Sequence, residues 1–215
     1  HMEVSKVPVI IVGTGSSGKV ALEIANSLEV LVYSFLTAKE EEVNQEINDI
    51  PIFNTVDSQD SAALLADENV KIVIAEQEIA DRKAMVEAIS DATAETITMA
   101  HASAIISSHA KLGIGNLIYP SVVILPNVLM ANCNLVETGV SIDPGVSIGD
   151  FCTIQAGAKI GADVSIDDEV FIGTGAILRK GISVGKGAII GAGSVVMTDV
   201  EEGKTVFGNP SKALD

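Results

Sequence analysis

The sequence predicts a small α/β unit followed by a parallel β-helix. The main observation is a ladder between residues 106 and 200, in which an aliphatic residue or Met recurs at every sixth position without a gap. A helix requires a period near 3.6 and a strand a period of 2, so a period of six indicates short strands joined by turns at fixed spacing. The second observation is the alternation of strand-like and helix-like segments before residue 98, which is typical of a parallel α/β sheet.

The ladder residues are expected to point inward and to stack on their equivalents in neighbouring coils. Three six-residue segments make one three-sided coil, so the stretch provides roughly five coils. A β-sandwich with regularly spaced strands is the alternative, but its strands would not keep one register over so many steps. The ladder consists of Ile106, Leu112, Ile118, Ile124, Met130, Val136, Ile142, Ile148, Ile154, Ile160, Ile166, Ile172, Leu178, Val184, Ile190 and Val196.

The chain begins with a strand, a glycine-rich turn and a helix, in the order of a phosphate-binding motif. Residues 7–12 are apolar, residues 13–18 read GTGSSG, and residues 19–28 have a helical pattern. Glycines at such a turn allow backbone N–H groups to approach a phosphate at the helix N-terminus. A purely structural glycine turn is the alternative. A ligand is expected at the carboxyl ends of the strands, beside Gly13, Gly15, Ser16, Ser17 and Gly18.

The following segments complete the α/β unit. A second strand at residues 30–36 is followed by Thr37 and Ala38, where a dinucleotide-binding protein would carry an acid for the ribose hydroxyls, so NAD binding is disfavoured. An edge-type segment is expected at 50–53, a strand at 70–75, and helices near 61–66 and 81–89. We therefore expect domains at residues 1–100 and 101–203 and a tail at 204–215, and we interpret His1 and Met2 as a vector remnant.

Composition and charge exclude several classes of function. The formal net charge of −16 argues against nucleic acid or an anionic membrane surface as partner. No signal peptide or membrane span is expected, and two cysteines are too few for a disulfide framework, which indicates a cytoplasmic protein. Basic residues gather near the C-terminus, so an anionic ligand is expected there, although solubilising surface residues would give the same pattern. They are Arg179, Lys180, Lys186, Lys204 and Lys212.

Four features together resemble one enzyme family. They are the glycine-rich α/β unit, the sequence HASA from His101, the array with IGAGSVV at residues 190–196, and the tail VFGNPSK at residues 206–212. The combination is similar to the PglD/NeuD-type nucleotide-sugar acetyltransferases over almost the whole chain. The resemblance implies a left-handed β-helix and a homotrimer. It also implies acetyl-CoA as acyl donor, bound between adjacent β-helices, and a nucleotide-linked amino sugar as acceptor.

The resemblance further implies a set of donor-site residues at the coil corners and in the tail. Glycines there would expose N–H groups to the pantetheine amides, and nearby basic side chains would meet the phosphates. Tight corners alone would also require glycines, so a structural role is the alternative. The implied donor-site residues are Gly173, Gly175, Ala176, Lys180, Gly191, Ala192, Gly193, Ser194, Gly208 and Lys212.

The catalytic position departs from the family pattern. The family carries a His followed by Asp or Glu, where the imidazole acts as general base and the acid orients it. Pro144 and Gly145 occupy these two positions, with the six-residue register intact on both sides. Asp143 is the only acid beside the vacant position and is the candidate base, unless it is a solvent-facing turn residue. An amine acceptor that arrives partly unprotonated would tolerate the missing base.

The residues implied for the acceptor depart from the family pattern as well. Thr37 and Ala38 replace the family's acidic pair, whereas Arg82 is kept and would counter one phosphate. His101 and His109 cannot supply the three ligands of a hexapeptide-type carbonic anhydrase, so no metal is expected. Two functions from different classes stay open: an acetyl-CoA-dependent acetyltransferase, or a catalytically disabled trimer that binds CoA or nucleotide. A trimer would cover outward apolar positions such as Leu117, Val123, Leu125 and Leu129.

Overall fold

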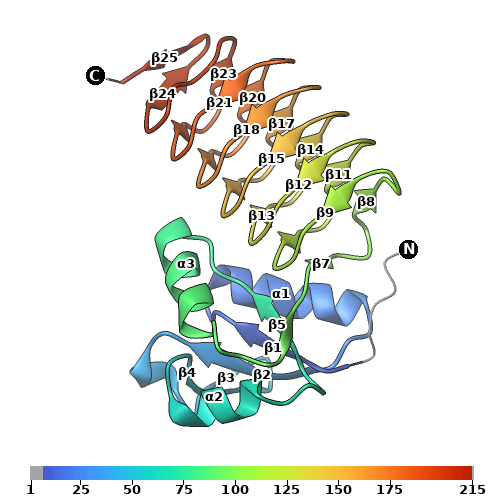
Figure 1. The fold of residues 1–215 in the computed structure, drawn as a ribbon, viewed down its shortest axis with the longest axis vertical. Helices are drawn as coiled ribbons and strands as arrows, with labels where there is room; N and C mark the ends of the chain where they lie inside the picture. The colour runs from blue at the N-terminus through green and yellow to red at the C-terminus, as the bar shows by residue number, and fades with distance from the viewer. Residues whose placement is uncertain (1–6, 215) are drawn as a thin grey trace. The chain divides into compact units, whose positions relative to one another are not determined.

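The computed structural model describes residues 7–214, so the interpretation of His1 and Met2 concerns positions outside the described residues. The chain divides into two compact units, and the division falls between Ala102 and Ser103. Unit 1 contains the helices and unit 2 is a stack of coils with short strands (Figure 1). The predicted order, an α/β unit followed by a parallel β-helix, is confirmed.

Unit 1 is built on a six-stranded sheet. All neighbouring strands pair in parallel except β3, which runs antiparallel to β4. The edge-type segment predicted at residues 50–53 therefore lies inside the sheet, because the two-residue strand β3 covers its outer side. The spatial order is β3 (Glu46–Ile47), β4 (Ile50–Thr55), β2 (Val32–Thr37), β1 (Val9–Val12), β5 (Lys71–Ile74) and β6 (Glu95–Thr96).

Three helices pack on this sheet. The first, α1 (Ser16–Ser27), contacts β1 and β2. The others, α2 (Gln59–Leu65) and α3 (Ile79–Ala88), contribute Leu65 and Met85 to one core cluster with apolar strand residues. A 3-10 helix, η1 (Glu40–Glu42), follows β2, and β7 (Met99–Ala100) is the last strand of unit 1. None of the helices within residues 7–214 has the length and apolar character needed to cross a bilayer.

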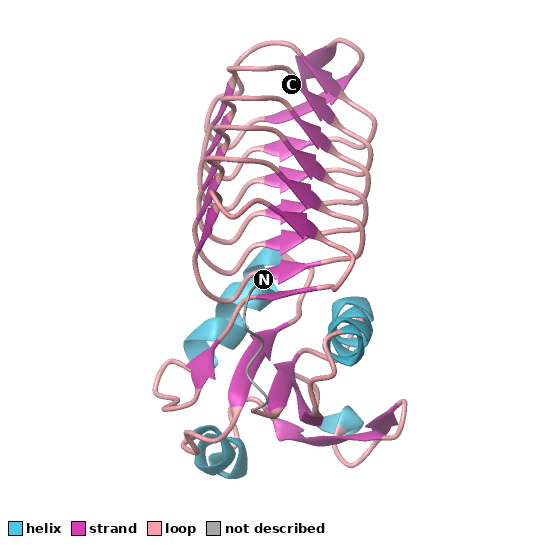
Figure 2. Cartoon of the chain, turned by 90° about the vertical axis from the view of Figure 1, so that its right-hand side faces the viewer, coloured by secondary structure: helices cyan, strands magenta, loops and turns pink. Residues whose placement is uncertain are grey.

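Unit 2 is a three-sided solenoid, and each side is a column of short strands that pair in parallel, except for the last strand, β25, which is antiparallel to β24 (Figure 2). Face 1 contains β10 (Leu117–Ile118), β13 (Leu135–Val136), β16 (Thr153–Ile154), β19 (Phe171–Ile172), β22 (Ile189–Ile190), β24 (Thr205–Gly208) and β25 (Ser211–Ala213). Face 2 contains β8 (Ile105–Ile106), β11 (Val123–Ile124), β14 (Ser141–Ile142), β17 (Lys159–Ile160), β20 (Ile177–Leu178) and β23 (Val195–Val196). Face 3 contains β9 (Lys111–Leu112), β12 (Leu129–Met130), β15 (Ser147–Ile148), β18 (Ser165–Ile166) and β21 (Ser183–Val184).

The six-residue ladder forms the core of unit 2. From Ile118 to Val196 each ladder side chain is at most 3% exposed, whereas Ile106 and Leu112 in the open first coil are half-buried. Each strand pairs with the strand one coil later, so positions 18 residues apart stack on one another. The outward apolar prediction holds for Leu129, which is 52% exposed, but it is wrong for Leu117, which is already buried within a single copy of the chain.

Candidate functional site

Unit 1 carries a pocket of about 350 Å³ at the carboxyl ends of its central strands. The turn after β1 contributes Thr14 and Gly15, the end of β2 contributes Thr37, and the loop before α3 contributes Glu76. This is the edge of the sheet at which a ligand is expected for a parallel α/β fold. The remaining lining residues are Ala38, Lys39, Val56, Asp57, Asp81, Ala84, Met85 and Ala88.

The glycines of the turn after β1 have different roles. Gly13 has a φ of +121°, and a Cβ there would overlap the carbonyl oxygen of Ala75. A Cβ at Gly18 would overlap the carbonyl oxygen of Gly13, so this glycine lets α1 pack closely on the turn. A Cβ at Gly15 would meet nothing within 4 Å, and Gly15 lines the pocket. The first and third glycines therefore serve packing, and the second leaves the N-terminus of α1 open to the pocket.

A carboxylate that the sequence did not indicate lies beside this pocket. The hydroxyls of Thr14 and Thr37 both donate to Oε2 of Glu42, at 2.5 and 2.6 Å, and Nζ of Lys39 donates to Oε1 at 3.3 Å. Partial burial raises the pKa of Glu42, but these hydrogen bonds and the Lys39 charge outweigh it and hold the pKa below its usual value. Since both hydroxyl protons are donated to Glu42, the two threonine oxygens can only accept hydrogen bonds from a ligand.

Arg82 shapes the loop before α3. Its side chain is 1% exposed, and Nη1 donates to the carbonyl oxygens of Glu76 and Gln77 at 2.6 and 3.1 Å. The Glu76 carboxylate accepts the N–H groups of Gln77 and Glu78 at 2.7 and 3.1 Å. Arg82 was expected to counter a phosphate directly. The geometry instead gives it a structural contact with the pocket wall.

The predicted donor-site glycines of unit 2 fall into one column of corners between face 1 and face 2. Gly173 to Ala176 follow β19, and Gly191 to Ser194 follow β22, one coil later. The hydroxyl of Ser194 accepts the N–H of Gly208 at 3.2 Å, which holds the tail against the column. Ala176 and Ser194 are buried, so their backbone is what a ligand could contact. In the tail, Lys212 pairs with Phe207 in a hairpin.

In this column, the backbone N–H of Ala192 lacks the side-chain acceptor that the equivalent N–H groups of the two preceding coils have. The N–H of Ala156 donates to Glu137 at 3.1 Å, and the N–H of Thr174 donates to Gln155 at 3.2 Å. One coil later, the position equivalent to Glu137 and Gln155 is Gly173, which has no side chain to accept a hydrogen bond. The N–H of Ala192 therefore has no hydrogen bond to any residue in 7–214. A Cβ at Gly173 would lie 2.5 Å from the Ala192 nitrogen, so this glycine also serves the tight stacking of the coils.

Pro144 and Gly145, which the sequence analysis placed at the expected catalytic position, lie at a different corner, between β14 on face 2 and β15 on face 3. Asp143 is half-buried, and its N–H donates to the carbonyl oxygen of Ile160 at 3.0 Å. Pro144 and Gly145 are exposed. In the next coil, Oδ2 of Asp163 lies 3.7 Å from Nζ of Lys180. Lys180 therefore belongs to this corner and not to the glycine column with which it was grouped from the sequence.

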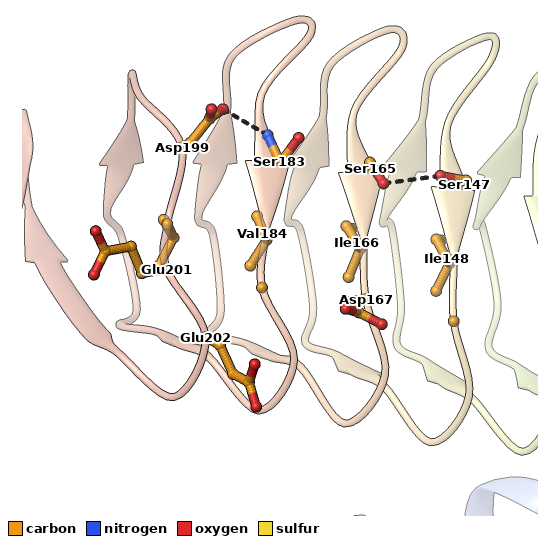
Figure 3. A pocket seen from close by; sticks show the side chains of 13 residues that line it. Ser147, Ile148, Ser165, Ile166, Asp167, Ser183, Val184, Asp199, Glu201 and Glu202 are labelled. Atoms are coloured by element: carbon orange, nitrogen blue, oxygen red, sulfur yellow. Dashed lines mark hydrogen bonds between the residues drawn. The ribbon is translucent and has the colours of Figure 1, made fainter.

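A second groove and the distribution of possible metal ligands were compared with the predicted site residues. A groove of about 590 Å³ runs along face 3, where the hydroxyls of Ser147 and Ser165 are 3.3 Å apart (Figure 3). It contains none of the predicted site residues, and its carboxylates disfavour an anionic ligand; they are Asp167, Asp199, Glu201 and Glu202. Within residues 7–214, no cluster of three or more His, Cys, Asp and Glu side chains has a geometry that could hold a metal ion.

The chain is similar to a hexapeptide-repeat family model and to solved acetyltransferase structures. The family described as the hexapeptide repeat of succinyl-transferase matches residues 131–162 and 163–197. The acetyltransferase domain of PglB from Neisseria gonorrhoeae, solved with acetyl coenzyme A, is 26% identical; the match covers 97% of this chain and 99% of that chain, with a TM-score of 0.88. No curated protein sequence matches significantly.

Two other solved structures share the fold. PerB, a perosamine N-acetyltransferase from Caulobacter crescentus solved with CoA and GDP-perosamine, is 22% identical with a TM-score of 0.89, covering 97% of both chains. WeeI from Acinetobacter baumannii is 22% identical with a TM-score of 0.82, covering 96% of this chain and 99% of that chain. Unit 2 is accordingly a left-handed β-helix. The resemblance to the PglD/NeuD-type acetyltransferases is thereby confirmed, and the chain is an acyltransferase with a hexapeptide-repeat β-helix.

Proposed function

We propose that the chain transfers the acetyl group of acetyl-CoA to the amino group of a nucleotide-linked sugar. The observation that carries this proposal is the match to the acetyltransferase domain of PglB, which was solved with acetyl coenzyme A and is similar over nearly the whole chain. PerB, which has the same fold over its whole length, was solved with CoA and GDP-perosamine. These two matches support a donor site and a nucleotide site in the present chain, which contains both units.

For the donor we propose the glycine column and the tail. The N–H of Ala192, which has no acceptor within residues 7–214, can donate to a pantetheine carbonyl. No atom lies within 4 Å of a Cβ built at Gly175 or Gly193, so the donor can approach the backbone at these corners. Lys212, which is exposed on the tail hairpin, would meet a CoA phosphate. Lys180 would contribute from the neighbouring corner, and Gly173, Ala176, Gly191, Ser194 and Gly208 shape the column.

For the acceptor we propose the pocket of unit 1. The N-terminus of α1, a helix of 12 residues, favours a phosphate beside Gly15, Ser16 and Ser17. The oxygens of Thr14 and Thr37 favour hydrogen-bond donors, such as ribose hydroxyls or the N–H groups of a base. Gly13 and Gly18 hold the turn, and Arg82 holds the facing loop.

For the chemistry we propose that an amine acceptor compensates for the missing histidine. The loss of a positioned general base typically lowers a rate by about 10²–10⁴-fold, but the binding and orientation of the two substrates survive that loss. A carboxylate at the corner of Pro144 and Gly145 would take the proton, and Asp143 is the candidate from the sequence. The second candidate function, a disabled CoA-binding or nucleotide-binding homologue, is favoured by the same replacement of the dyad by Pro144 and Gly145.

A homotrimer and a cytoplasmic location complete the proposal. Several outward strand residues of the β-helix are apolar and exposed: Ile105 is 64%, Ile177 45% and Ile189 44% exposed. A second and third copy of the chain would cover them. Cys133 and Cys152 are free and buried, which is compatible with a reducing compartment.

Isothermal titration and a thiol assay together test the proposed function. The full chain should bind acetyl-CoA, and it should release free CoA thiol only when a nucleotide-linked amino sugar is present. The panel should include GDP-linked and UDP-linked amino sugars together with their hydroxyl analogues, because a hydroxyl nucleophile needs the missing base more than an amine does. Binding of acetyl-CoA without thiol release on any acceptor would favour the disabled homologue.

A further inference from the structure

The corner at the vacant catalytic position already holds a carboxylate from the next coil. Gly145 has a φ of +76°, and a Cβ added to it would overlap Oδ1 of Asp163. Asp163 is 18 residues later, directly above Gly145 in the stack of coils. Its carboxylate therefore occupies the space into which a side chain at position 145 would project. In the related acetyltransferases an acid is expected at that position.

Most corner glycines lack this arrangement, although a carboxylate also lies over Gly149, where Oδ1 of Asp168 accepts the N–H of Asp150. Seven other corner glycines with positive φ have nothing within 4 Å of an added Cβ: Gly139, Gly157, Gly175, Gly181, Gly187, Gly193 and Gly203. Gly181 is the informative comparison, because it has the same φ of +76° and lies one coil beyond Asp163 in the same column. Corner geometry alone therefore does not bring a carboxylate over a glycine.

The neighbours of Asp163 orient its two oxygens differently. Its N–H donates to the carbonyl oxygen of Pro144 at 3.0 Å, which fixes its backbone on the vacant corner. Oδ2 faces Nζ of Lys180 at 3.7 Å, while Oδ1 lies over Gly145. The side chain is 62% exposed, so a substrate can reach it. An exposed ion pair of this kind contributes little to stability, so the carboxylate can be changed without unfolding the protein.

We infer that Asp163, and not Asp143, is the catalytic carboxylate of this enzyme; the inference rests on the proposed acetyl transfer. The amine nitrogen of the acceptor attacks the thioester carbonyl carbon, so that a C–N bond forms and the C–S bond breaks. The proton lost by the nitrogen passes to Oδ1 of Asp163. Oδ1 then passes this proton to the departing thiolate, which leaves an amide, the free thiol of CoA and an ionised Asp163.

Two substitutions remove this carboxylate from the corner. Asp163→Asn keeps the shape but cannot accept a proton, and we expect kcat to fall by about 10²–10⁴-fold with a much smaller change in the KM for acetyl-CoA. Gly145→Ala should have a similar effect, because the methyl group displaces Oδ1. Gly181→Ala is the matched control, since it introduces the same backbone strain without meeting a carboxylate, and it should retain most of the wild-type kcat. Asp143→Asn, which tests the competing candidate, should lower kcat less than Asp163→Asn does.

Three outcomes would overturn the inference. The first is an Asp163→Asn variant with wild-type kcat in the full chain. The second is an equal loss of kcat in Gly145→Ala and Gly181→Ala, which would assign the loss to backbone strain. The third is a larger loss in Asp143→Asn than in Asp163→Asn. If the wild-type chain itself releases no thiol with any acceptor, the proposed function fails and the inference fails with it. An active wild type with an unaffected Asp163→Asn variant rejects the inference alone.

Discussion

The pocket of unit 1 and the corner at Pro144 and Gly145 in unit 2 share one feature. Thr37 in unit 1 and Gly145 in unit 2 each occupy a position where the family is expected to carry an acid. At both places a carboxylate from another position lies close by, Glu42 in unit 1 and Asp163 in unit 2. Glu42 in unit 1 accepts hydrogen bonds from three side chains, whereas Asp163 in unit 2 has one exposed ion pair. The comparison indicates that Glu42 holds its surroundings in place, while Asp163 remains available for chemistry.

The largest effect is expected from restoring the lost imidazole. Pro144→His places a base beside a carboxylate that is already present, so the single change should raise kcat by about 10²-fold, within the usual range for general-base catalysis. Changing Gly145 to an acid as well should not help, because its side chain would collide with Asp163. The measurement is kcat for thiol release. The gain should disappear when Pro144→His is combined with Asp163→Asn, and its persistence would show that Asp163 does not orient the imidazole.

The next largest effect is a difference in the free energy of unfolding between a variant of the packing glycine Gly13 and a variant of the pocket glycine Gly15. Gly13→Ala should lower the free energy of unfolding by about 1–3 kcal/mol from backbone strain, with a further loss from the overlap with Ala75. Gly15→Ala has open space and an ordinary φ of −71°, so its stability should stay within about 0.5 kcal/mol of wild type. Urea denaturation of both variants checks this. Equal losses would contradict the division of roles.

A smaller effect concerns the acid dependence of stability. The folded pKa of Glu42 is lowered, so its stabilisation is present above the unfolded value near 4.5 and is lost as the pH falls through the folded value. Glu42→Gln should therefore lower the free energy of unfolding at pH 7 by about 1 kcal/mol. The difference from wild type should shrink below pH 4.5. Glu40→Gln on the same 3-10 helix, which is exposed, is the control and should show no such pH dependence.

The smallest effect completes the comparison of the two carboxylates. Asp163→Asn breaks only an exposed ion pair, so the free energy of unfolding should change by less than about 1 kcal/mol even though kcat falls. Glu42→Gln should show the opposite balance, with a loss of stability and little change in kcat. Thermal unfolding and thiol release measured on the same two preparations check both statements. A stability loss for Asp163→Asn larger than that for Glu42→Gln would reverse the assignment.

The sequence determined more of unit 2 than of unit 1. The ladder from Ile118 to Val196 was predictable, because a solenoid with a fixed pitch gives every residue a known neighbour. Asp163 could have been found in the same way, by adding one coil to Gly145. Glu42 could not, because its position depends on how the chain turns after β2. That turn is set by hydrogen bonds among Thr14, Thr37 and Lys39 and not by any periodicity.

Arg82 and Leu117 are both buried, although the sequence led us to expect a phosphate contact for the first and an exposed side chain for the second. Arg82 is buried under the loop of Glu76 and Gln77, and Leu117 is buried although its strand position predicts an outward side chain. A residue type and a local pattern indicate what a side chain can do, but the packing of other segments decides whether it is exposed to do it.

We propose that the chain acetylates an amine with a carboxylate as proton acceptor. The most direct measurement is mass spectrometry of the nucleotide sugar after incubation with acetyl-CoA and the full chain, before and after mild alkaline treatment. We expect a singly acetylated acceptor whose acetyl group survives the alkali, because an amide is stable under these conditions. An acetyl group that is lost in alkali would show an ester and a hydroxyl acceptor, and an unmodified acceptor would show that no transfer occurs. Either result would contradict the account.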